Sequence, residues 1–320
     1  MPNLLSESLE EKEFALFAKK AVKSKRLGNE VLQENRDSLL RKLHLVEGSY
    51  LKRASALLFH EDPEQYITGA YVKIGFFKTD ADLVYQDEIH GNLFQQVDGT
   101  MDLLLTKYMK AYISYEGLQR VERYLFPEPA LREALLNAVV HKDYSSGNPV
   151  QISVYEDKII FWNAGRLPDE LSIELLQKKH PSIPFNPLVA SAFFRAGYIE
   201  AWGRGIEKIN NECKLAGVPV PKINYDYAGL MITFQSDIVG KTQVETQVET
   251  QVERKSKTRG LILHTLSSDP GMTLAEVAER TGKSLSAIER AASKLVKEGR
   301  LHHMGPKKGG YWKIHGKTTG

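Results

Sequence analysis

The chain has 320 residues, of which 42% are hydrophobic and 26% are charged. This composition is typical of a globular protein, and the length is sufficient for two or three domains. No apolar run approaches the roughly eighteen residues of a membrane span, and no secretory signal follows Met1. The single cysteine, Cys213, can form neither an intramolecular disulfide nor a thiolate zinc site. We therefore expect a cytoplasmic protein without a membrane partner.

The net charge of +3 conceals an uneven distribution of charge along the chain. Residues 254–320 contain 14 Lys and Arg residues against 5 Asp and Glu residues, whereas the rest of the chain contains 29 basic and 35 acidic residues. A basic C-terminal segment behind a mildly acidic body predicts that the end of the chain contacts nucleic acid.

The first 110 residues form an α/β segment in this interpretation. Helical patterns cover residues 9–25 and 36–45, and two alternating stretches at residues 66–77 and 81–89 predict a pair of strands. A further helix is predicted for residues 93–112, before the region in which the chemistry of the chain is concentrated.

A second region is predicted for residues 111–238, and its first helix contains "ALREALLNAVVHKDY", residues 130–144. Glu133, Asn137 and His141 recur every four residues and therefore share one helix face, although the positions between them are apolar. Two strands in "NPVQISVYEDKIIFWNAG" follow, then a helix-rich span at 169–211 and a hairpin at 223–236. A polar line on an apolar helix indicates either a hydrogen-bonded core network or one wall of a binding site.

A repeat, "TQVETQVETQVE" at residues 242–253, marks the boundary between two compositions. It is too short for a stacked repeat domain, and we interpret residues 239–257 as a linker. A short self-associating tether is the alternative.

The C-terminal segment, residues 258–316, shows three amphipathic helices followed by two short strands around a Gly/Pro/Lys turn. Thr273 and Glu276 form the capping box of the second helix. This order predicts a winged helix-turn-helix domain. Double-stranded DNA is the expected partner, with a protein-contact role as the alternative. The polar residues of the third helix and of the wing that we expect at the DNA are Lys283, Ser284, Ser286, Arg290, Lys294, Lys307 and Lys308.

Residues 130–209 also contain the groups that a magnesium–nucleotide site needs. An amide oxygen at Asn137 suits magnesium, which prefers oxygen ligands, and a carboxylate one turn earlier at Glu133 can orient water. In "GYIEAWGRGIEKI", residues 197–209, Gly203 and Gly205 stand at the start of a predicted helix, where bare backbone N–H groups favour phosphate, and Arg204 adds a positive charge. Lys178, Lys179 and His180 indicate either a solvated face or phosphate contacts from a lid.

The order of these motifs resembles the ATP-binding domain shared by gyrase, a class of heat-shock chaperones, histidine kinases and MutL, known as the GHKL or Bergerat fold. The match is closer to one divergent branch, the bacterial and archaeal ATP-binding transcriptional regulators often labelled as related to the end of RecG helicase. "PALREALLNAVVHKDYSSGNPVQISVYEDKIIFWNAGRLP", "HPSIPFNPLVASAFFRAGYIEAWGRGIEKI" and the winged tail carry this resemblance in the family's order. It implies an α+β chain, with helices on a mixed sheet followed by a winged helix domain.

The resemblance also implies roles for individual residues, with ATP and Mg²⁺ as cofactors. Glu133 matches the water-activating carboxylate, and Asn137 matches the magnesium ligand. Asn163 stands where the wider superfamily has an Asp that accepts from the adenine amino group, and Gly165 allows the base to approach. The nucleotide-binding positions implied in total are Asn137, His141, Asn163, Gly165, Gly203, Arg204 and Gly205.

The function implied is that of an ATP-binding, DNA-binding transcriptional regulator, as a homodimer, whose nucleotide site modulates DNA binding by the tail. The N-terminal segment resembles only the end of the Schlafen-like (AlbA-related) domain that usually begins these regulators. Two alternatives remain: a magnesium-dependent ATPase with Glu133 as general base and the tail as targeting module, and a degenerate nucleotide fold acting as a scaffold. A helicase is not expected, because the Gly-x-x-x-x-Gly-Lys-Ser/Thr phosphate loop is missing from the sequence.

Overall fold

A computed structural model describes residues 1, 3–109, 111–116, 119–167, 171–176, 178, 180–200, 202–236, 259–306 and 310–314, with the backbone alone for 111–116 and 119–123. The chain divides into two compact units, residues Met1–Val239 and Gly240–Gly320. The predicted linker, residues 239–257, lies outside the described residues.

A mixed six-stranded sheet organises the first unit, with the strand order β4-β3-β7-β8-β10-β9. The strands are β3 (Val72–Thr79), β4 (Asp82–Ile89), β7 (Val150–Val154), β8 (Lys158–Ala164), β9 (Lys222–Asp226) and β10 (Gly229–Gln235). β3 and β7 run parallel, and the other neighbours are antiparallel. Because β3 and β4 belong to this sheet, the N-terminal segment predicted for residues 1–110 shares a compact unit with the residues that follow it.

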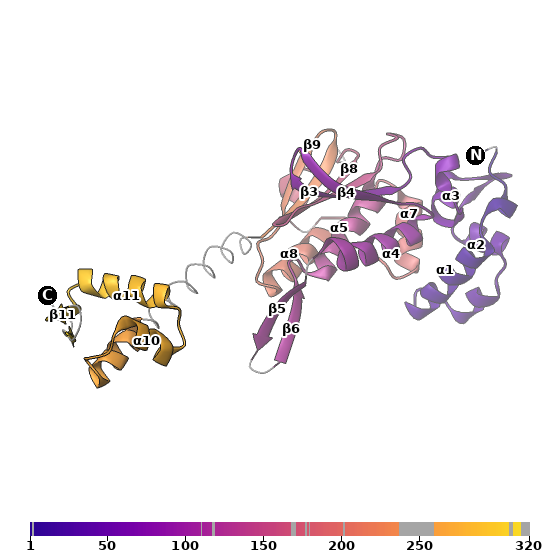
Figure 1. The fold of residues 1–320 in the computed structure, drawn as a ribbon. Coiled ribbons are helices and arrows are strands. Elements are labelled where there is room, and N and C mark those ends of the chain that lie inside the picture. The colour runs from indigo at the N-terminus through magenta and orange to yellow at the C-terminus, as the bar shows by residue number, and fades with distance from the viewer. Residues whose placement is uncertain are drawn as a thin grey trace. The chain divides into compact units, whose positions relative to one another are not determined.

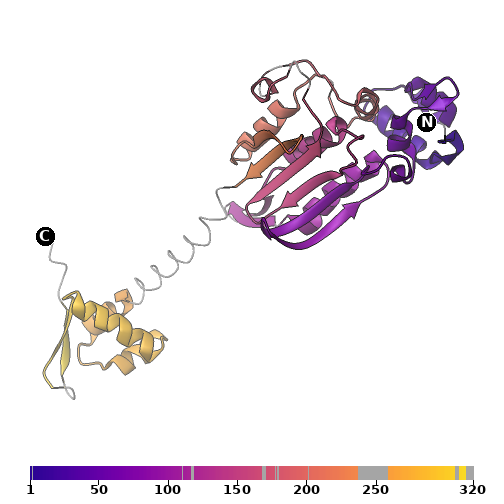
Figure 2. The same cartoon turned by 90° about the horizontal axis from the view of Figure 1, so that it is seen from above.

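Side chains alternate along the strands as a half-covered sheet requires. In β7, Val150, Ile152 and Val154 are buried, whereas Gln151 between them is exposed. The covered face packs against α4 (Leu93–Leu103), α5 (Glu128–His141) and α8 (Gly205–Leu215), which lie along one side of the sheet in Figures 1 and 2. Of these helices, α5 has the most buried residues.

Further elements complete the first unit. The remaining described α-helices of this unit are α1 (Glu11–Lys23), α2 (Arg36–Lys42), α3 (Arg53–Phe59), α6 (Ile173–Leu176) and α7 (Pro187–Arg195), and β1 (Val46–Glu47) pairs with β2 (Tyr50–Leu51). α1, α2 and α3 lie together near the N-terminus (Figure 1). Phe14 of α1 stacks on Phe59, with 4.0 Å between ring centroids, and this aromatic contact joins α1 to the end of α3.

The segment after α4 differs from the prediction. The helix predicted to reach residue 112 ends in a π-helical turn, Leu104–Tyr108, and an unpredicted hairpin follows, with β5 (Ala111–Glu116) paired to β6 (Gln119–Tyr124). This hairpin extends away from the sheet in Figure 1. Its strands belong to a separate two-stranded sheet.

The second unit has the predicted winged form. Residues 259–268 are helical and are followed by α10 (Leu274–Thr281), α11 (Leu285–Lys297) and an antiparallel pair, β11 (Leu301–Met304) and β12 (Tyr311–Ile314). Thr273 and Glu276 form the predicted capping box. The hydrophobic core of this second unit consists of Ile262, Leu266, Val277, Ala278, Ile288, Ala292, Leu295 and Leu301. The predicted fold class, α+β with helices on a mixed sheet followed by a winged helix-turn-helix, is confirmed.

Candidate functional site

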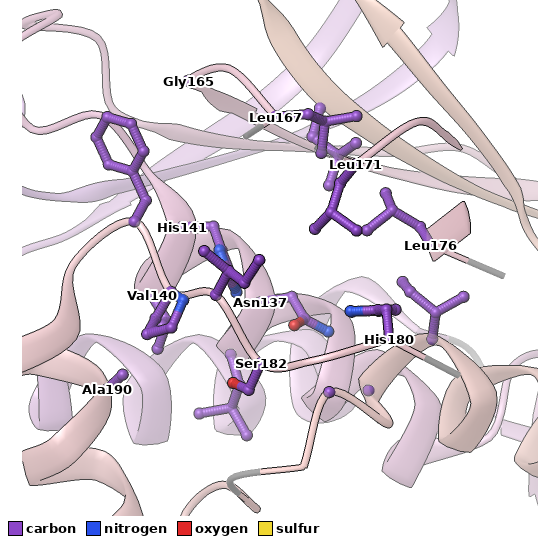
Figure 3. A pocket seen from close by; sticks show the side chains of 18 of the residues that line it. Asn137, Val140, His141, Gly165, Leu167, Leu171, Leu176, His180, Ser182 and Ala190 are labelled. Atoms are coloured by element: carbon purple, nitrogen blue, oxygen red, sulfur yellow. The ribbon is translucent and has the colours of Figure 1, made fainter. Parts of the chain in front are cut away.

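α5 forms the floor of a cavity in the first unit. Asn137 and His141 lie along its upper side beneath the cavity, while Leu167, Leu171 and Leu176 cover it from above (Figure 3). Downstream segments supply the other walls, at Asn163, at Gly203–Ile206 and in β9–β10. The complete lining is Glu133, Leu136, Asn137, Val140, His141, Asn163, Gly165, Arg166, Leu167, Leu171, Leu176, His180, Ser182, Ile183, Pro184, Phe185, Ala190, Ile199, Glu200, Gly203, Arg204, Gly205, Ile206, Tyr225 and Leu230.

The predicted residues of the first unit therefore all line one cavity. They come from three separate parts of the chain: the helix α5, the end of β8 and the start of α8. The cavity lining shows where these residues lie. Their roles in binding and catalysis stay predictions.

The end of α5 is folded back onto the end of β8. The side chain of Asn186 donates to the carbonyls of Val140 and Lys142, at 2.9 and 2.7 Å, and so pairs acceptors that the helix end leaves free. The backbone N–H of Asp143 donates to the carbonyl of Ala164 at 2.8 Å. These bonds hold His141 beside Gly165. A Cβ added at Gly165 would stand 3.1 Å from the carbonyl oxygen of His141.

Glu133 is nearly enclosed, and Lys208 of α8 provides its charge partner. The Nζ atom of Lys208 lies 3.1 Å from Oε2 of Glu133, whose side chain is only 10% exposed. Lys208 was not among the predicted residues. Its position four residues after Arg204 on a predicted helix was the one sequence signal that it faces the same side.

Asn137 has an unpaired amide. Its Nδ2 atom is buried and has no hydrogen-bond partner among the described residues. A buried polar atom without a partner costs free energy unless a ligand satisfies it. The amide can turn by 180° at little steric cost and then presents its oxygen at the same place. Asn137 beside the Glu133 carboxylate therefore fits an oxygen-preferring cation such as Mg²⁺.

The start of α8 lies directly against these two side chains. A Cβ at Gly205 would stand 2.9 Å from Asn137 Nδ2 and 2.9 Å from Glu133 Oε1, so a larger residue does not fit without displacing them. Arg204 precedes the helix and donates to the carboxylate of Glu207 at 3.0 Å. Free backbone N–H groups and the positive end of the dipole thus meet the Glu133–Asn137 face.

Gly203 is required for a different reason. Its φ of +64° lies in the left-handed region. A Cβ at this residue would stand 2.4 Å from the carbonyl oxygen of His180. The segment that covers the cavity therefore rests on this glycine.

The opposite end of the cavity is formed by Asn163 and the neutral imidazole of His141. Asn163 is 4% exposed, and its Nδ2 donates to the carbonyl of Ala164 at 3.2 Å, which leaves the amide oxygen as an acceptor. Burial, with the nearby charge of His180, lowers the pKa of His141 to about 4. His141 is therefore uncharged at neutral pH and offers a hydrogen bond rather than a charge.

The sequence did not identify the apolar cover of the cavity. Leu171, Leu176, Ile183 and Phe185 lie among polar or proline-rich residues, and only tertiary structure shows that they face the site. His180 lines the cavity, whereas Lys179 lies outside the described residues.

The second unit presents its predicted polar residues to solvent. Lys283, Ser284, Ser286, Arg290 and Lys294 are all exposed, on α11 or immediately before it. Arg290 Nε donates to the carbonyl of Ser286 at 3.0 Å. Lys307 and Lys308 lie outside the described residues.

In comparisons with known proteins, a segment of each unit matches a family. Residues 147–234 match a family described as "Putative ATP-dependent DNA helicase recG C-terminal", and residues 255–301 match one described as "Winged helix-turn-helix DNA-binding". A search of proteins with curated functions found no match.

A crystal structure of the DIP2311 protein from Corynebacterium diphtheriae matches 98% of this chain and 63% of that chain, with a TM-score of 0.61 and 17% identity. At this identity the likeness shows a shared fold alone. The chain spans about 63% of the length of that protein. In the described part of the chain, no helix combines the length and apolar composition needed to span a bilayer.

Proposed function

Because the chain has the domain composition of the RecG-related ATP-binding regulators, an ATPase-like domain followed by a winged helix-turn-helix domain, we propose that it is a transcriptional regulator controlled by ATP. The ATPase-like domain supports nucleotide binding, and the winged domain supports DNA binding. In this proposal, nucleotide binding to the first domain changes the affinity of the winged domain for DNA.

The observation that carries the proposal is the convergence of unpaired and helix-terminal polar groups in an otherwise apolar cavity. The amide of Asn137, the Oε1 atom of Glu133 and the start of α8 lie within a few ångströms of one point, beside Gly205. Such a combination suits a magnesium-bound phosphate group. Asn137 would hold Mg²⁺ through its amide oxygen, and Mg²⁺ would supply positive charge that neutralises the phosphates when bound.

The other end of the cavity suits an amino-bearing base. The oxygen of Asn163 would accept from the exocyclic amino group of adenine, and the neutral His141 would hydrogen-bond to the base or sugar. Guanine presents an oxygen instead of an amino group at the equivalent position, which would leave Asn163 facing another acceptor. The site therefore favours ATP over GTP.

Nucleotide binding would move the cover of the cavity. The cavity has a volume of about 120 Å³, smaller than the roughly 300–1,000 Å³ of most ligand pockets. Leu176, His180 and Phe185 are among the described residues that cover it. Outward movement of these residues would admit the nucleotide, and their return would enclose it.

The winged unit would bind double-stranded DNA through α11. Ser284, Ser286 and Arg290 would face base edges in the major groove, and Lys294 would meet backbone phosphate. In a homodimer, two such units would read two half-sites. Lys283, Lys307 and Lys308 would add phosphate contacts.

Isothermal titration calorimetry with ATP and GTP, in the presence and absence of Mg²⁺, tests the nucleotide part. We expect ATP to bind in preference to GTP, with lower affinity when EDTA replaces magnesium. Asn163→Leu, which removes the acceptor at similar size, is expected to abolish the preference. A chain that binds neither nucleotide would instead be the scaffold alternative.

A further inference from the structure

The ion pair between Lys208 and Glu133 lies at the seam between two packed helices, α5 and α8. The carboxylate side chain is 10% exposed, whereas the lysine side chain is 44% exposed and reaches it from the solvent side. Lys208 stands one turn after Gly205, the residue at the phosphate end of the cavity. The ion pair therefore borders the cavity, which Glu133 lines.

The two oxygens of Glu133 have different surroundings. Oε2 accepts from Lys208 at 3.1 Å. Oε1 faces Gly205, where it lies 2.9 Å from the position that a Cβ would take. The amide atoms Nδ2 and Oδ1 of Asn137 lie 2.9 and 3.2 Å from the same point. Lys208 therefore holds one oxygen while the other is directed at the start of α8.

A general base works only when its acceptor atom is directed at the proton it removes, and a third group often fixes that direction. The other cation nearby, Arg204, already donates to Glu207 at 3.0 Å. Lys208 is thus the described cation bonded to Glu133, and no hydrogen bond to another described side chain is found for that carboxylate. Without Lys208, the carboxylate could turn and take Oε1 away from Gly205.

We propose that Lys208 is a positioning residue for ATP hydrolysis, which holds Oε2 of Glu133 so that Oε1 faces the water that attacks the terminal phosphate. This rests on the proposed function, since it requires ATP in the cavity. The water oxygen bonds to the terminal phosphorus as the bond from that phosphorus to the bridging oxygen breaks. The water proton passes to Oε1 of Glu133, and the electron pair of the broken bond leaves with ADP.

The test measures phosphate release at saturating and limiting ATP for the full chain. Lys208→Met keeps the length of the side chain and removes its charge, and Lys208→Arg keeps a donor for Oε2. Lys214→Met, at an exposed position of the same helix, is the matched control. Lys208→Met is expected to lower kcat about 10- to 100-fold, as for other groups that orient a reacting side chain, with KM unchanged. Lys208→Arg should retain a large part of the rate, and Lys214→Met all of it.

Calorimetric titration of the same proteins with ATP and Mg²⁺ separates the possible failures. If Lys208→Met binds ATP like the parent but keeps or exceeds its kcat, Lys208 does not position Glu133. If the parent binds ATP but releases no phosphate, the chain does not hydrolyse ATP and the positioning role is refuted. The proposed function, which needs only ATP binding, would be unaffected. No binding to the parent would refute the proposed function and the positioning role together. Lys208→Gln also removes the charge and is measured in the same way. A loss of kcat in both variants would then not be due to a folding defect caused by methionine.

Discussion

Lys142, at the end of α5, is an unexpected buried side chain. It follows His141, is fully buried, and its Nζ atom has no hydrogen-bond partner among the described residues. The ring of Tyr144, 4.1 Å from Nζ, is its nearest favourable contact. Burial lowers the pKa of Lys142 from 10.5 to about 8, against the attraction of Asp143. The chain therefore holds an amine whose charged form is destabilised by folding.

The free energy of unfolding should depend on this amine above neutral pH. Below about pH 8 both states are protonated, and the folded state carries the full cost of a buried charge. Between about pH 8 and pH 10.5 the unfolded chain binds a proton that the folded chain has released, so stability rises with pH. A shift of this size corresponds to about 3 kcal/mol. Lys142→Met is expected to stabilise the chain at pH 7 and to flatten this rise.

Urea denaturation of parent and Lys142→Met at pH 7 and pH 9.5 measures both effects, and the difference between the two proteins removes the contribution of other titrating groups. An equal pH dependence in the two proteins would show that Lys142 is not the cause.

Residue-level prediction from the sequence succeeded where the geometry is local. A spacing of four residues predicts that Glu133, Asn137 and His141 share one face of a helix, and all three line the cavity. Lys208 was missed because its contact with Glu133 joins residues 75 positions apart. The burial of Lys142 was likewise invisible, since a lysine after a helix end is ordinarily solvated.

At the scale of elements, two residues just beyond the end of α1 donate hydrogen bonds to the end of α7 and to the segment that joins α7 to α8. The guanidinium of Arg26, just beyond α1, donates to the carbonyls of Phe194 and Ile199 at 3.1 and 3.3 Å and lies 3.8 Å from the centre of the Phe194 ring. Ser24 donates to the carbonyl of Arg195 at 2.9 Å. Ile199 lines the cavity. The segment that follows α1 therefore supports the turn before Gly203–Gly205, where the phosphate end of the proposed site would lie.

Arg26→Ala should weaken this support. We expect a loss of about 2–3 kcal/mol of stability, because charged hydrogen bonds of this kind contribute roughly 1.5–3 kcal/mol, together with weaker binding of ATP. Lys23→Ala, at an exposed position of α1, is the control. Chemical denaturation and calorimetry measure the two quantities; an Arg26→Ala variant with the ATP affinity of the parent would show that the turn does not influence the site.

Elements were predicted well where one face is buried and poorly elsewhere. The strands of the six-stranded sheet and the capping box of α10 followed from alternation and from Thr273 and Glu276. The β5–β6 hairpin was missed because it pairs only with itself, in a separate two-stranded sheet, so no neighbouring strand pattern indicated it. The helix predicted before it was therefore extended as far as residue 112, whereas it ends in the turn Leu104–Tyr108.

At the scale of the whole molecule, the proposal requires that nucleotide binding change DNA binding. A ligand shifts such an equilibrium only through a difference in its affinity for two states. Saturating ATP with Mg²⁺ is expected to change the affinity for an operator several-fold, by fluorescence anisotropy at fixed salt concentration. Asn137→Ala should remove the response and leave DNA affinity without nucleotide unchanged. An operator affinity that is independent of ATP would exclude coupling.

The organisation into a body and a winged unit could be predicted from charge and from the repeat between them, because composition changes along the chain. How the two units communicate could not, since their coupling depends on alternative states that neither periodicity nor motif order encodes.

Thermal unfolding with and without ATP and Mg²⁺ tests the central claim, that Asn137 and its neighbours form a magnesium–nucleotide site. Ligand at a hundred times its dissociation constant stabilises the folded state by about 2.7 kcal/mol, which raises the melting temperature of a unit of this size by roughly 5–10 °C. We expect this rise for the parent, a smaller one with EDTA, and none for Asn137→Ala. A parent whose melting temperature does not change, or an Asn137→Ala variant that responds as the parent does, would contradict the central claim.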